Sequence, residues 1–68
     1  MKLKIRVRNG RGQLVDDDYS DNEDDARQQA SGWTGQRGQM TWEATIYNPE
    51  GKAVATYRRG EEVREERA

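Results

Sequence analysis

Residues 2–8 alternate strictly between basic and apolar side chains, and this pattern constrains the fold more than any other part of the chain. Successive side chains of a β-strand point to opposite faces, so a period of two predicts a half-buried strand. Its core side would carry Leu3, Ile5 and Val7, and its outer side would carry Lys2, Lys4, Arg6 and Arg8. Such a strand requires a sheet that is covered on one face and solvated on the other.

A turn signal follows this strand. Gly10 and Gly12 can take positive φ and predict a hairpin turn into a short second strand around residues 13–15. The acidic residues that come next are expected to interrupt that strand. The first third of the chain is therefore predicted to form one β-hairpin.

A second hairpin is predicted from residues 40–58. Residues 40–47 alternate between apolar and polar side chains, and the turn sequence Asn48-Pro49-Glu50-Gly51 leads into a strand over residues 52–58. If Asn48 faces Lys52, then Ile46 faces Val54 and Ala44 faces Thr56. This register would place Tyr47 and Tyr57 with Thr45, Ala53 and Ala55 on the opposite, semi-apolar face, which would be either the actual helix side or a dimer surface.

A helix is predicted between the hairpins, from about Asp21 to Ser31. Ser20 and Glu23 fit a capping box. In this motif the serine hydroxyl oxygen accepts from the backbone amide of Glu23, and the glutamate carboxylate accepts from the backbone amide of Ser20. Ala26 and Ala30 lie four residues apart and give the helix one inward face. Gly32 is expected just past its end.

These elements predict an α+β fold, a small antiparallel sheet of two hairpins with one helix on one face, in the order ββαββ. Residues 1–58 would form a single domain, and residues 59–68 a charged tail that is a frayed helix or disordered. The expected core comprises Leu3, Ile5, Val7, Leu14, Tyr19, Trp33, Met40, Trp42, Ala44, Ile46 and Val54.

Composition excludes several kinds of chemistry. The 68 residues include no Cys and no His, which removes disulfides, thiolate metal sites and the commonest general base. The acidic residues lack the glycine that an EF-hand loop requires, so no metal or cofactor is predicted. No segment is long and apolar enough to span a membrane, and the chain is expected to be a cytoplasmic, non-enzymatic protein.

The charges are strongly divided along the sequence. Seven carboxylates and no basic residue lie between Asp16 and Asp25, whereas five basic residues and no acid precede Asp16. Clustered acids can occupy a basic groove on another macromolecule and steer association. We therefore predict an accessory or inhibitor protein that binds a basic partner protein through Asp16, Asp17, Asp18, Asp21, Asp24 and Asp25. Acids at a helix N-terminus also have a purely structural use, since they interact favourably with the helix dipole.

Two alternative functions remain open on the sequence. Basic side chains on a strand can hold the phosphates of single-stranded nucleic acid, and the candidates are Lys2, Lys4, Arg6, Arg8 and Arg11. That strand contains no aromatic residue for base stacking, and the pI of about 5.4 lacks the basic excess of typical nucleic-acid domains. The second alternative is a structural homodimer subunit.

Two resemblances to phage proteins accompany these patterns. The segment from Trp42 to Tyr57, WEATIYNPEGKAVATY, resembles the hairpin of the AP2-like arm-binding domains of phage integrases. The order of a strand, an acidic Tyr-Ser-Asp helix start and a Trp-bearing strand is similar to small phage proteins that inhibit host enzymes. The first resemblance lacks the helix that should follow the hairpin, and neither includes a diagnostic motif. They are compatible with a phage-encoded protein and assign no family.

Overall fold

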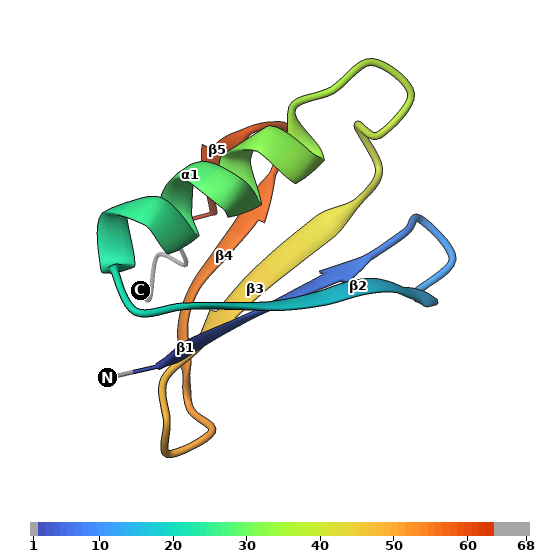
Figure 1. The fold of residues 1–68 in the computed structure, drawn as a ribbon. Coiled ribbons are helices and arrows are strands. Elements are labelled where there is room, and N and C mark those ends of the chain that lie inside the picture. Colours follow the sequence, from blue (N-terminus) through green and yellow to red (C-terminus); the bar gives the residue numbers. More distant parts are fainter. Residues whose placement is uncertain (1, 64–68) are drawn as a thin grey trace, which may run out of the picture.

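The computed structural model describes residues 2–63 as a five-stranded antiparallel sheet with one helix on one face (Figure 1). The elements are β1 (Leu3–Arg8), β2 (Leu14–Ser20), α1 (Glu23–Thr34), β3 (Glu43–Tyr47), β4 (Ala53–Arg58) and β5 (Glu61–Glu62). The order in the sheet is β2-β1-β3-β4-β5, so β1 pairs with both β2 and β3 and joins the two hairpins. The predicted α+β fold with its ββαββ order is confirmed, and β5 is an addition to it.

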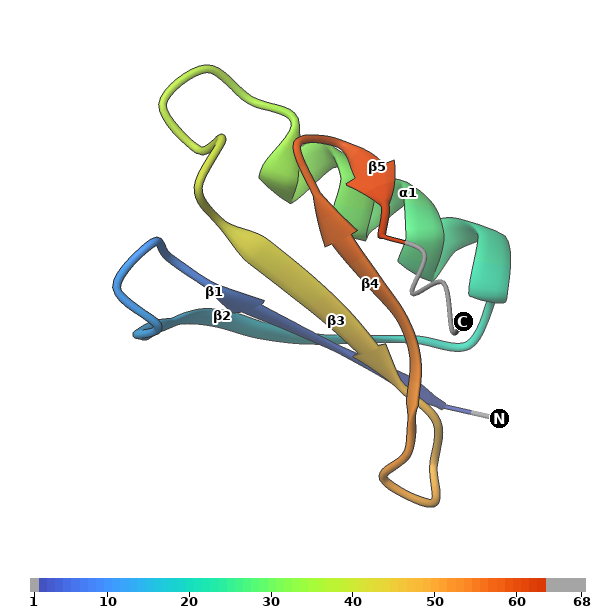
Figure 2. The ribbon, with the colours of Figure 1, turned by 180° about the vertical axis from the view of Figure 1, so that it is seen from behind.

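The alternation in β1 has the predicted consequence. Leu3, Ile5 and Val7 are at most 3% exposed and lie under the helix. Viewed from behind in Figure 2, β3 and β4 lie in front of α1, so the opposite face of the sheet carries no helix. We call this uncovered side the open face, and it carries the outward side chains of β1.

β2 continues through the acidic residues that were expected to interrupt it. Its pairing places Asp17 opposite Arg6, and a pair of opposite charges on neighbouring strands is favourable. The basic side chains of β1 thus compensate for the low strand propensity of aspartate in β2. β2 ends at Ser20, which is 8% exposed and pairs with Leu3.

The helix begins and ends later than predicted. Its N-cap is Asn22, whose Oδ1 accepts hydrogen bonds from the backbone amides of Asp24 at 2.8 Å and Asp25 at 3.2 Å. Ser20 cannot be the cap because it is still in β2. The C-cap is Gly35, so Gly32 lies inside the helix.

The inward side of α1 was predicted correctly and extends one turn further. Ala26 and Ala30 are fully buried, and Thr34 continues the same face four residues later at 0% exposure. Small side chains allow the helix to lie close to the sheet.

A β-bulge between Ile46 and Tyr47 makes the predicted register of the second hairpin wrong. Ile46 pairs with Ala55 instead of Val54, and Ala44 pairs with Tyr57. An extra residue in one strand moves the following side chains to the other face. Ala55 and Tyr57 are therefore buried under the helix, whereas Val54 is 38% exposed.

Further corrections concern the edges of the core. Leu14, Tyr19 and Met40 were predicted to be buried but are 52%, 51% and 47% exposed. Leu14 and Tyr19 belong to the edge strand β2, and Met40 precedes β3. Trp33 and Trp42 pack on the core from its margin, with ring centroids 6.0 Å apart in a stacked arrangement.

The start of the predicted tail is part of the sheet. Residues 59–60 turn the chain into β5, which pairs with β4. The backbone of Gly60 is held by α1: its carbonyl accepts from Ser31 Oγ at 2.7 Å, and its amide donates to Thr34 Oγ1 at 3.0 Å. The rest of the predicted tail, residues 64–68, lies outside the described residues.

Candidate functional site

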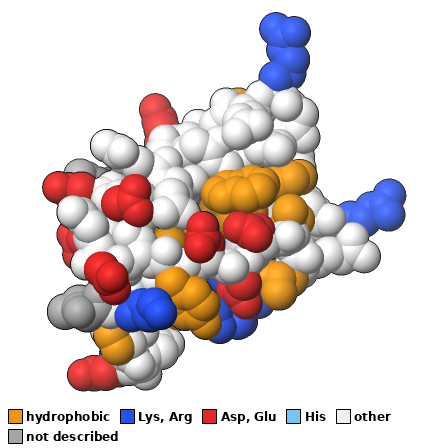
Figure 3. All heavy atoms as spheres, in the orientation of Figure 1, with side chains coloured by type: hydrophobic (Ala, Val, Ile, Leu, Met, Phe, Trp, Pro, Cys, Tyr) orange, Lys and Arg blue, Asp and Glu red, His pale blue; other side chains and the backbone are white. Residues whose placement is uncertain are grey.

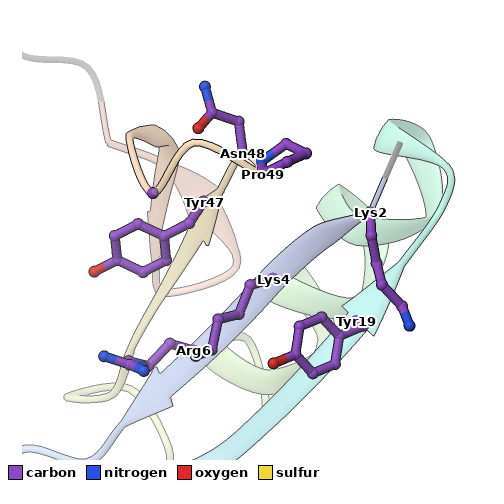
Figure 4. A pocket seen from close by; sticks show the side chains of 8 residues that line it. Lys2, Lys4, Arg6, Tyr19, Tyr47, Asn48 and Pro49 are labelled. Carbon is purple, nitrogen blue, oxygen red and sulfur yellow. The ribbon is translucent and has the colours of Figure 1, made fainter.

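The open face brings two tyrosines to the basic strand. Tyr19 of β2 and Tyr47 of β3 both pair with Lys4 of β1, so the three residues form one row across three strands. Neighbouring strands lie about 4.8 Å apart, so the backbone positions of the two tyrosines are about 10 Å apart. In Figure 4, Lys4 lies between the two rings, and Arg6 extends to the side of the Tyr47 ring.

The basic side chains contact these rings directly. Lys2 Nζ and Lys4 Nζ lie 5.2 Å and 5.9 Å from the centroid of the Tyr19 ring. Arg6 Cζ lies 5.9 Å from the centroid of the Tyr47 ring. These distances are within the range of cation–π attraction.

The row forms part of a hollow of about 340 Å³, which we call the first hollow. It is lined by Lys2, Lys4, Arg6, Tyr19, Tyr47, Asn48, Pro49 and Gly51. Three cations and two aromatic rings therefore face one open space. The cations could be identified from the sequence alone. The two rings belong to neighbouring strands, and their position beside the cations follows only from the strand pairing.

The other two predicted basic residues lie outside the first hollow. Arg8 follows Arg6 on the same side of β1, and its Nη1 donates to the carbonyl of Gly12 at 3.4 Å. Arg11 is exposed at the tip of the β1–β2 hairpin.

One predicted acidic residue also lies on the open face. Asp17 accepts from Arg6 Nε at 3.4 Å and lies 3.7 Å from Lys4 Nζ. Side chains in both pairs are about a third exposed, so each pair is weak. Asp17 is thus an internal counter-ion of the first hollow.

The remaining predicted acids lie on the helix side of the sheet, in α1, or in the connection between β2 and α1. Asp16 and Asp18 pair with Val7 and Ile5, whose side chains point toward the helix, so they share that side of the sheet. Asp24 and Asp25 are in the first turn of α1, and Asp21 lies in the connection before it. Figure 3 shows acidic side chains gathered over α1 and β2 beside a group of hydrophobic side chains. The six predicted acids therefore do not form one surface.

Part of the acidic set has a structural role. Asp25 Oδ2 lies 2.8 Å from Ser20 Oγ and accepts from Gln29 Nε2 at 2.9 Å. These contacts connect the end of β2 to the first turns of α1. Asp25 is accordingly less available to a partner than Asp16 or Asp18.

Arg27, on the helix side of the sheet, has a raised pKa. A hydrogen bond to the Tyr57 hydroxyl, followed by the charge of Glu62, raises the pKa of Arg27 above its ordinary value. Arg27 Nη1 donates to Glu62 at 2.6 Å and to Tyr57 at 3.3 Å, which ties α1 to β4 and β5. This network explains how β5 is held.

Two negative findings apply to the part of the chain that the structure describes. Across residues 2–63, no cluster of three or more candidate ligand side chains is placed to hold a metal ion. Within the same range, no helix has the length and apolar character needed to cross a membrane.

Comparison with protein-family models, with curated proteins and with solved structures finds no match for this chain.

Proposed function

We propose that this protein is a non-enzymatic module that binds single-stranded nucleic acid on its open face. The observation that supports this proposal is the row Tyr19–Lys4–Tyr47, with Arg6 beside it in the same hollow. Aromatic rings provide stacking platforms for bases, and the cations beside them attract the linking phosphates. The base of a nucleotide would contact a tyrosine ring, and its phosphate would contact a neighbouring cation.

Unpaired strands fit this surface better than a duplex. Stacking on a tyrosine requires the face of a base, which a double helix hides within its own stack. Since the chain has a net charge of -1, attraction for phosphate is confined to the face that carries the cations. Neutralisation of up to three phosphates by Lys2, Lys4 and Arg6 predicts a log–log salt slope of about -2.

The test is a titration of a fluorescently labelled oligothymidylate, followed by anisotropy at low salt. Replacement Tyr47→Ala should weaken binding by about 5- to 150-fold, the equivalent of ~1–3 kcal/mol for one stacked base. Tyr47→Phe should retain most of the affinity because it keeps the ring. Equal affinities for the wild type and Tyr47→Ala would contradict the proposal, as would the absence of binding at low salt.

A charge control compares one lysine that lines the first hollow with one that does not. Lys4→Gln should lower the affinity and reduce the salt slope by about 0.7. Lys52→Gln removes the same charge from the β3–β4 turn, outside the first hollow, and should have little effect. If both variants lose affinity equally, the attraction is a property of net charge and not of this site.

A second candidate function uses the helix side. Asp16 and Asp18 lie there with the acids of the first helical turn and with exposed hydrophobic surface, a combination suited to a basic partner protein. This proposal predicts that Asp16→Lys with Asp18→Lys abolishes partner capture, whereas Asp17→Lys does not, because Asp17 faces the other way. Capture that survives the double reversal would eliminate it.

A further inference from the structure

A second hollow, of about 390 Å³, lies at the end of the open face near the β1–β2 and β4–β5 turns. Its charged lining consists of Arg8, Arg58, Arg59 and Glu43, with Met40 and Thr41 among the other residues. Three arginines and one glutamate therefore line the same hollow. Arg58 Nε donates to Glu43 at 2.8 Å, which leaves Arg8 and Arg59 as the main source of positive potential.

The two hollows are connected by β1. Lys4 and Arg6 line the first hollow and Arg8 lines the second, and all three point to the same face. Alternate residues of a strand are about 6.6 Å apart, so these three cations form a row about 13 Å long. A single strand that follows this row would pass from one hollow into the other.

The backbone at Arg59 gives a separate reason to regard the second hollow as a site. Arg59 has φ 55° and Gly60 has φ 79°, the left-handed pair of a tight hairpin turn. Asn or Gly normally occupies the first of these positions, and the left-handed conformation costs other L-residues about 1 kcal/mol. The chain thus carries a large cation at a position that disfavours it, and that residue lines the hollow.

We infer that the second hollow is a phosphate subsite for the same nucleic-acid strand, held by Arg8 and Arg59. This inference rests on the proposed function and extends its footprint beyond the tyrosine row. It predicts that affinity increases with oligonucleotide length until both hollows are occupied, and that Arg59 contributes only to the longer ligands.

The experiment compares Arg59→Asn with the wild type, using oligothymidylates of about four and about twelve nucleotides, within the usual range of single-strand site sizes. Arg59→Asn should weaken binding of the longer ligand by about 3- to 10-fold and reduce its salt slope by about 0.7. Binding of the shorter ligand should be unchanged. The melting temperature should stay the same or rise, because Asn tolerates the left-handed conformation.

Arg11→Gln is the matched control, since it removes one positive charge from an exposed hairpin tip outside both hollows. An equal loss in Arg11→Gln and Arg59→Asn, or an equal loss for both ligand lengths, would overturn the inference. If both ligands bind with the same affinity and Arg59→Asn has no effect, the subsite fails while the proposed function stands. If neither ligand binds the wild type, both fail.

Discussion

Replacing Asp17 with Asn should strengthen nucleic-acid binding. Asp17 lies 3.4 Å from Arg6 Nε and 3.7 Å from Lys4 Nζ, so an incoming phosphate must compete with it for both cations. The side chains are about a third exposed, and pairs of this kind contribute at most ~1 kcal/mol each. Releasing both cations should therefore lower the dissociation constant about 3- to 10-fold at low salt, with a smaller gain at high salt.

The assay is the anisotropy titration at two salt concentrations, with Asp16→Asn as the matched control. Asp16 is adjacent in β2 and its loss changes the net charge equally, but it lies on the helix side of the sheet. Its replacement should change the dissociation constant less than about twofold, because solvent and salt screen charges at that distance. An Asp17→Asn variant that binds no more tightly than Asp16→Asn would show that Asp17 does not compete with phosphate for Lys4 and Arg6.

The remaining predictions concern stability, measured as the free energy of unfolding in urea. Gly60→Ala should lower the free energy of unfolding by about 2–3 kcal/mol, and Gly51→Ala by only about 1 kcal/mol. Both glycines have positive φ, but a Cβ at Gly60 would lie 3.2 Å from Gly35 Cα, whereas a Cβ at Gly51 would meet open space. Equal losses would contradict this prediction. Thr34→Val should cost about 1–3 kcal/mol by leaving the Gly60 amide without its acceptor, and an unchanged stability would be the opposing result. Asn22→Ala should cost about 1 kcal/mol as a lost N-cap, with a loss near zero counting against that role.

The predictable part of the fold is the part that local patterns determine. The alternation of residues 2–8 set both faces of β1, and the spacing of Ala26 and Ala30 set the inward side of α1. The bulge at Ile46 and Tyr47 could not be predicted, because its origin is the pairing of two strands and a one-residue shift exchanges their faces. The helix start was displaced because Ser20 and Asn22 are both good caps, and the extension of β2 decides between them.

The sequence predicted the cations of the candidate site but not its aromatic rings. Lys2, Lys4 and Arg6 were identified from the sequence, but Tyr19 and Tyr47 join them only through pairing across β1. The acidic residues were treated as one surface because β2 was expected to end before them. In a strand, alternate residues point to opposite faces, and this separates Asp17 from its neighbours.

Nuclear magnetic resonance of isotope-labelled protein, titrated with an oligothymidylate, would locate the binding surface and so test whether the open face binds single-stranded nucleic acid. Amide shift changes should concentrate on β1 and around Tyr19 and Tyr47, and those in α1 should remain small. Changes centred on α1 and its acidic first turn, or no saturable changes at low salt, would contradict it.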